Sequence, residues 1–109
     1  MANAYKVLGQ NDLPETTLTD VYTVPAATET VISTIIIANR TDSAETFRIA
    51  IRPNGAAVAD QNYIAYGVPI AANDSTTLTL GITLDATDVL SVWASAVDLS
   101  VNVFGTEIS

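Results

Sequence analysis

Residues 76–95 read TTLTLGITLDATDVLSVWAS and contain the most regular pattern of the chain. Leu78, Leu80, Ile82 and Leu84 occupy alternate positions, and threonine or glycine fills the positions between them. Strict alternation of this kind is typical of a strand with one buried face and one solvent-facing side. A turn-forming Asp-Ala-Thr-Asp segment then leads into a second apolar run. The stretch therefore predicts two strands joined by a tight turn.

The same period of two continues through most of the chain, and turn signals return at short intervals. The expected strands are 4–10, 18–24, 30–40, 45–53, 62–70, 76–84, 89–96 and 99–108. About eight short strands predict a single all-β domain over residues 1–109, an antiparallel β-sandwich of jelly-roll or immunoglobulin-like type. The only helical candidate, residues 56–61, is too short to stand alone, so no significant helix is expected.

Residues 30–40, TVISTIIIANR, differ from the other segments because both of their phases are apolar. Ile35 and Ile37 share one phase, and Ile36 and Ala38 share the other. A strand that is apolar on both phases is typical of the centre of a sheet with both faces covered. We therefore expect this segment to be a central strand covered on both sides.

The composition excludes several classes of function. The chain of 109 residues has a formal net charge of −8, with four Lys and Arg residues together. Such a balance argues against nucleic acid and against an anionic membrane surface, both of which attract basic proteins. Histidine and cysteine are absent, which removes a Ser–His–Asp triad and the usual zinc ligands. No secretory signal and no apolar run of about 20 residues is present, so we expect a soluble protein made without export.

Three aspartates in turns are the remaining candidates for chemistry. Asp74, Asp85 and Asp88 could serve as paired carboxylates of a glycosidase or as oxygen ligands of Ca²⁺. Their spacing fits no compact calcium loop, and aspartate in a β-turn normally accepts hydrogen bonds from its own backbone. We therefore interpret them as turn residues and predict no enzyme activity, no metal site and no cofactor.

The threonine face of the quoted strand carries almost no charge. Thr77, Thr79 and Thr83 suit a solvent-facing strand because threonine is β-branched and polar. Sheet proteins usually protect exposed edges with lysine or proline, yet Lys6 is the only lysine in the chain. This shortage of charge favours sheets or edges that other subunits cover.

Two arginines form a second candidate contact. Arg48 and Arg52 share one face of a strand, and Arg40 lies just before that strand. They form either a cationic strip that docks an acidic neighbour, such as another copy of the chain, or ordinary surface residues paired with Glu45 and nearby carboxylates. The sequence leaves both interpretations open.

Aromatic residues and the N-terminus complete the candidate interface. Trp93 and Phe104 fall outside the main apolar phase of their strands, so we expect them to be neighbours on an outer face or part of a second buried layer. Residues 1–10, with Tyr5 and Lys6, form a possible N-terminal strand or arm that contacts a neighbouring subunit.

Six phrases of the sequence resemble a known group of proteins. They are ANAYKVLGQ, VYTVPAATETVISTIIIANR, FRIAIRP, NYIAY, AANDSTTLTLGITLDATDVLSVWAS and VNVFGTEI, which together run over nearly the whole chain in order. In these phrases the chain resembles small virion proteins of tailed bacteriophages, above all those of aquatic and cyanobacterial phages. The resemblance has no catalytic signature.

The resemblance implies a β-sandwich subunit present in many copies in a phage particle. The expected function is that of a non-enzymatic capsid decoration or cement protein, which binds copies of itself and another virion protein such as the major capsid protein. A tail, neck or fibre component, or a carbohydrate- or receptor-binding module at the virion surface, is the alternative. The implied location is the virion, after synthesis in the host bacterial cytoplasm.

Overall fold

The structure is a computed structural model that describes residues 2–109, and it confirms the predicted all-β fold. Eight strands form two four-stranded antiparallel sheets. The strands are β1 (Asn3–Leu13), β2 (Thr19–Thr23), β3 (Glu29–Asn39), β4 (Glu45–Arg52), β5 (Tyr63–Ile70), β6 (Ser75–Leu84), β7 (Val89–Ala94) and β8 (Leu99–Ile108). Each overlaps one of the eight segments expected from the alternating pattern.

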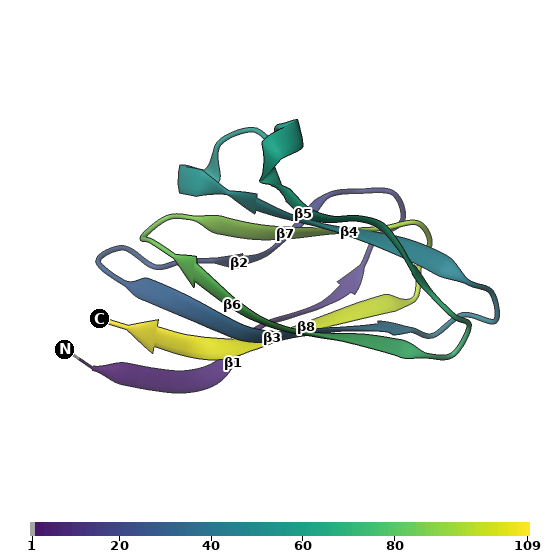
Figure 1. Cartoon of the computed structure of the whole chain (residues 1–109), viewed down its shortest axis with the longest axis horizontal. Helices are drawn as coiled ribbons and strands as arrows, with labels where there is room; N and C mark the ends of the chain where they lie inside the picture. The colour runs from purple at the N-terminus through teal and green to yellow at the C-terminus, as the bar shows by residue number, and fades with distance from the viewer. Residues whose placement is uncertain (1) are drawn as a thin grey trace.

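Of the two predicted sandwich types, the strand order is that of a jelly roll. Sheet A has the order β1-β8-β3-β6, and sheet B has the order β2-β7-β4-β5. The first strand therefore pairs with the eighth, the second with the seventh, the third with the sixth and the fourth with the fifth. This is one long antiparallel ribbon rolled into two layers, which is the arrangement of a jelly roll. Figure 1 shows the two layers, with both termini at one end.

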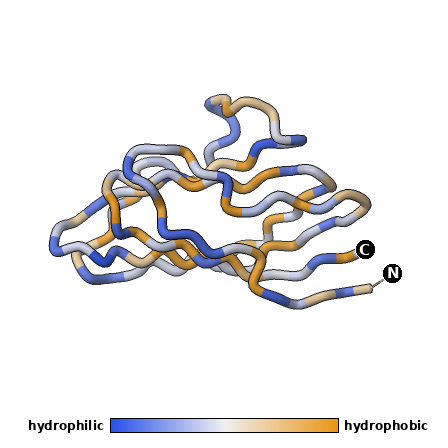
Figure 2. The backbone as a smooth tube through the Cα atoms, turned by 180° about the vertical axis from the view of Figure 1, so that it is seen from behind, coloured by the Kyte–Doolittle hydropathy of each residue, from blue (hydrophilic) through white to orange (hydrophobic). Residues whose placement is uncertain are grey.

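The core lies between the layers and is built from the inward phase of each strand. Alternation places these side chains on one face, where burial of aliphatic surface provides the main stabilisation. Figure 2 shows apolar and hydrophilic positions interspersed along both layers. The largest fully buried side chains are Phe47, Leu13, Ile32, Ile35, Ile37, Ile49, Leu90, Leu99, Val24, Val92, Val101 and Val103.

A line of bulges crosses sheet A at one level. The register shifts between Val7 and Gly9 on β1, and again at Ser33 of β3, beside Phe104 and Gly105 of β8. Bulges bend a sheet and increase its local twist. Gly105 is required at this bend, because a Cβ atom there would lie 2.1 Å from the backbone oxygen of Val31.

The N-terminal segment is a strand of its own sheet. β1 pairs with β8 along its whole length, and Ala2 and Ser109 exchange backbone hydrogen bonds of 2.7 and 3.0 Å. Residues 2–10 are therefore integrated into sheet A, which excludes a detached arm. One edge of β1 remains unpaired, and its contact with a neighbouring subunit stays a prediction.

The connection between β4 and β5 contains two short 3-10 turns in place of a helix. They are η1 (Pro53–Gly55) and η2 (Asp60–Asn62), and they pack against β7 and β4 on the outer side of sheet B. The connection projects from this side of the sandwich in Figure 1. Across residues 2–109, no helix has the length and apolar character needed to cross a membrane.

Candidate interaction surfaces

The outer surface of sheet A, here called face A, follows from the strand register. Residues directly opposite each other in antiparallel strands share a face, and the inward residues are fixed by the core. Two aromatic residues, Tyr5 and Phe104, lie on this face among small polar and aliphatic neighbours. The other uncharged members are Asn3, Val7, Gln10, Val31, Thr34, Ile36, Ala38, Ser75, Thr77, Thr79, Thr83, Ser100, Asn102, Thr106 and Ile108.

Face A is nearly free of charge. Within residues 2–109, its charged side chains are Asp12 and Glu29, which lie near opposite ends of the sheet. Asp12 is paired with Arg40 at 2.7 Å. Tyr5 and Val7 are 81% and 47% exposed, so part of the face is both apolar and open to solvent. Such a surface is typical of a protein contact.

Strand β3 is central, as predicted, but this chain covers only its inner side. Its neighbours in sheet A are β8 and β6, and its inward residues Ile35 and Ile37 are fully buried. Its outward residues Val31 and Ile36 are only partly buried. The prediction of cover on both sides is therefore wrong for the isolated chain, because no layer of residues 2–109 packs over face A.

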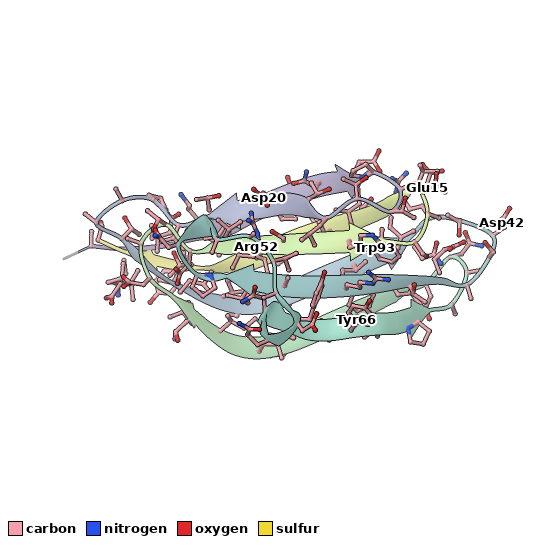
Figure 3. The ribbon with its side chains drawn as sticks, turned by 90° about the horizontal axis from the view of Figure 1, so that it is seen from above. Glu15, Asp20, Asp42, Arg52, Tyr66 and Trp93 are labelled. Atoms are coloured by element: carbon pink, nitrogen blue, oxygen red, sulfur yellow. The ribbon has the colours of Figure 1, made fainter. Side chains whose placement is uncertain are left out.

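The outer surface of sheet B, here called face B, has a different character. Arg48 on β4 lies between two aromatic rings, 3.9 Å from the ring centroid of Trp93 and 4.2 Å from that of Tyr66. The three residues are direct cross-strand neighbours on β7, β4 and β5. Figure 3 shows Trp93 and Tyr66 on this face. Stacking on two rings attracts the guanidinium through both ring quadrupoles.

The second arginine of face B, Arg52, forms its hydrogen bonds with other residues of the same chain. The Arg52 guanidinium donates to Asp20 at 2.6 Å, to Ser91 at 3.2 Å, and to the Gly55 and Ala56 carbonyls. Its side chain is only 15% exposed, and Figure 3 shows it beside Asp20. These bonds also hold the β4–β5 connection against sheet B. For Arg52, the interpretation as a surface residue paired with a nearby carboxylate is confirmed.

The other members of the predicted cationic strip are also occupied. Arg40 lies 2.7 Å from Asp12 and 3.9 Å from Asp98. Glu45, the expected partner of the arginines, instead accepts hydrogen bonds from Ser95 and Ser43. These two hydroxyl groups, Ser95 first, lower the pKa of Glu45. Face B therefore presents no row of free cations.

The structure separates Trp93 from Phe104. Trp93 is on β7 and faces outward from sheet B, whereas Phe104 is on β8 and faces outward from sheet A. The expectation that the two rings are neighbours is wrong, because chain order does not show which strands share a sheet. Both rings are partly buried, and neither belongs to the core between the sheets.

Lys6 closes one end of the sandwich. It lies opposite Gly105, on the inner side of β1, and its Nζ is 2.7 Å from the Glu107 carboxylate. Tyr22 of sheet B donates its hydroxyl to the same carboxylate at 2.6 Å. The hydrogen bonds from Lys6 and then Tyr22 lower the pKa of Glu107, and burial together with Glu107 raises the pKa of Tyr22 to about 12. Lys6 thus pairs with Glu107 within sheet A, Tyr22 joins the two sheets through the same carboxylate, and Lys6 is not part of face A.

A shallow hollow beside the arginine stack groups two tyrosines, a residue type considered for the carbohydrate-binding alternative, with an aspartate that the sequence pattern did not single out. Asp60, Tyr63 and Tyr66 line a hollow of about 480 Å³. The two tyrosine rings meet edge to face, with centroids 5.0 Å apart at 88°. The signal was hidden because Asp60 lies in a turn and because residues three apart in a regular strand face opposite sides. The register shift at Ile64 of β5 brings Tyr63 and Tyr66 together. Aromatic rings can stack on a sugar ring, and a carboxylate beside them can accept hydrogen bonds from the hydroxyl groups of the sugar.

The turn aspartates act as the sequence analysis predicted. Asp88 accepts from the backbone N–H groups of Asn54 and Asp85, at 2.8 and 2.9 Å. Asp74 and Asp85 each accept from the following backbone N–H at 2.8 Å. Over the described residues 2–109, no group of three or more acidic side chains is arranged to hold a metal ion.

Comparison with known proteins adds no relative. No protein-family model matches the chain, and no curated protein matches it in sequence. The resemblance to phage virion proteins therefore stays a prediction.

Proposed function

We propose that the protein is a non-enzymatic structural subunit of a tailed-bacteriophage virion and that it decorates the capsid. Face A is the proposed contact surface, and its partners are copies of the chain and another virion protein such as the major capsid protein. The subunit uses no cofactor and contacts neither nucleic acid nor membrane. It is made in the host cytoplasm and resides in the virion.

One observation carries this proposal: the outward phase of β3 includes three apolar residues although no layer of residues 2–109 covers it. A strand that faces water on one side normally alternates between apolar and polar residues, as β4 and β6 do more clearly. Val31, Ile36 and Ala38 depart from that pattern on the outward phase. A second protein layer over face A would bury them, and burial of apolar area is the main favourable term in association.

Location in the particle tests the proposal. Antibody against the purified chain should label capsids of the encoding phage in electron micrographs, and its copy number should scale with that of the major capsid protein. Its gene should lie next to the capsid gene. Label confined to the tail, in low symmetry-matched copy number, would instead make it a tail, neck or fibre component. Absence from purified particles would overturn the proposal altogether.

A second function, saccharide binding at the virion surface, is favoured by the hollow of Asp60, Tyr63 and Tyr66. Tyr66 is 62% exposed, and Asp60 has no ion-pair partner within residues 2–109. Titration with host polysaccharide, followed by tyrosine NMR signals, tests this function. Tyr66→Ala should remove any binding, whereas Tyr5→Ala on face A should leave it unchanged. Absence of shifts with the wild-type chain would exclude a saccharide site here.

A further inference from the structure

The four sheet edges of the molecule are protected to very different degrees. The edge strands are β1 and β6 in sheet A, and β2 and β5 in sheet B. Edge strands expose unpaired backbone N–H and C=O groups, which pair with another chain unless charge, proline, a bulge or short length prevents it. The edge that has the fewest of these features is the one expected to pair.

Three edges carry such features. β5 contains Pro69 and a glycine with positive φ, Gly67, at a register shift. β2 has only five residues, one of them Asp20. β1 carries Lys6, and its C-terminal part packs against β2 of the other sheet.

Strand β6 is the least protected edge. Its ten residues, STTLTLGITL, include no charge and no proline, and its extensive contacts are with β3 alone. A bulge at Leu80 and Gly81 opposite Ser33 divides it. The part before this bulge, residues 75–79, pairs with β3 in regular register and leaves its other edge free.

We infer that residues 75–79 pair antiparallel with the same segment of a second copy, about a two-fold axis at Thr77. Such an isologous contact places the same strand on both sides of the axis. In this register Ser75 faces the partner's Thr79, and hydroxyl side chains meet on face A, where Thr–Thr and Thr–Ser pairs are favourable. The two A sheets then become one sheet with a continuous face that is nearly free of charge.

The distribution of charge favours a second copy of the chain as the partner of this edge. Two chains of net charge −8 repel each other, and the repulsion is smallest where neither contributes a charged side chain. β6 meets that condition over its full length. Pairing of one short strand buries much less than the roughly 1,200 Å² of stable complexes, so the dimer is weak in solution and becomes populated at high local concentration. This inference deepens the proposed function by naming the partner of one edge.

Cysteine cross-linking tests the contact directly, because the natural chain contains no cysteine. Opposed residues in antiparallel strands have Cα atoms about 4.5–5.5 Å apart, within the range of a disulfide. Purified Thr77→Cys should form a disulfide-linked dimer under mild oxidation. Tyr5→Cys, also at an exposed position but on the edge strand β1, is the matched control and should cross-link much more slowly. Equal rates, or no dimer of folded Thr77→Cys, would overturn the inference.

Charge at the axis provides an independent measurement. Sedimentation of the wild-type chain at high concentration should show a dimer, and Thr77→Lys should abolish it by placing two lysines face to face. Thr83→Lys, beyond the bulge on the same face, should retain the dimer. Equal loss in both variants, or a wild-type chain that stays monomeric at all concentrations, would contradict the inference. Detection of the chain in particles is unaffected by these results, so the proposed function is tested separately.

Discussion

Faces A and B are the outer surfaces of two sheets with the same number of strands. They differ in how far their side chains are engaged by other residues of the same chain. On face B, Arg52 binds Asp20 and the β4–β5 connection, and Arg48 is held between two rings. On face A, threonines and aliphatic residues lie open, without a covering connection. Face B is thus largely covered by contacts within its own chain, and this difference supports the proposal that face A contacts another molecule.

The shape of face A depends most strongly on one glycine. In Gly105→Ala the new Cβ would overlap the Val31 backbone oxygen at 2.1 Å, so the bulge line must move. Overpacking of this kind costs about 3 kcal/mol of unfolding free energy. Gly81→Ala is the control, because a Cβ there meets no atom within 4 Å. Urea denaturation should show a large loss for the first variant and little change for the second; equal effects would refute the role of the close approach.

The hydrogen bonds within the chain that complete face B can be removed by replacing Arg52. Arg52→Met keeps the apolar stem but removes the charged donor of Asp20, which then accepts only from Ser91, and the side-chain donor of two carbonyl groups. We expect a loss of about 2 kcal/mol, since hydrogen bonds to charged groups contribute about 1.5–3 kcal/mol. The Arg40 side chain is 48% exposed, so its ion pair with Asp12 is more open to solvent. Arg40→Met should therefore lower the unfolding free energy by less than about 1 kcal/mol. If the two variants were equally stable in urea, face B would not be held by the Arg52 contacts.

The end of the sandwich links the two sheets through titratable groups. Glu107→Gln should lower the unfolding free energy by about 1–2 kcal/mol, because Lys6 and Tyr22 lose a charged acceptor. In the natural chain, the lowered pKa of Glu107 contributes stability that is fully present at pH values above the ordinary pKa of glutamate. This contribution is lost as the pH falls through the lowered pKa.

Tyr22 gives the opposite dependence at alkaline pH. Its pKa of about 12 lies above the value of about 10 in the unfolded chain. The unfolded chain therefore ionises first, and stability falls as the pH rises from about 10 to about 12. Urea midpoints measured across this range should decline for the natural chain. Tyr22→Phe should remove part of that slope, and an unchanged slope would show that Tyr22 does not cause it.

The smallest change in stability is expected on face A itself. Ile36→Thr keeps a β-branched residue on a partly exposed position, so the unfolding free energy should change by no more than about 0.5 kcal/mol. Binding of the subunit to capsids lacking it should nevertheless weaken, because the variant removes apolar area from the contact. Co-sedimentation with such capsids measures this effect, and unchanged binding would argue against Ile36 as a contact residue.

The sequence predicted the strands well and the surfaces only in part. Alternation located all eight strands because each buries one face, as Phe47 and Ile49 show on β4. The apolar outward phase of β3 also identified its central place. In both cases the signal is local and repeats with the period of the backbone.

Contacts between strands distant in sequence were not predictable in the same way. The stack of Arg48 between Trp93 and Tyr66 depends on the register of three strands, and the separation of Trp93 from Phe104 depends on sheet membership. Alternation shows that a side chain leaves the core but not which neighbour it meets. The partner of Lys6, a carboxylate 101 positions later in the chain, was hidden for the same reason.

Solvent access to face A in the free and assembled states tests the central claim most directly. Val7→Cys places one thiol on this face, and Ala57→Cys places one on the exposed β4–β5 connection outside face B. Both should react quickly with a maleimide in the free protein. In intact virions, the thiol at position 7 should be protected while that at position 57 still reacts. Equal, rapid reaction of both thiols in the particle would show that face A is bare there, and the account would be wrong.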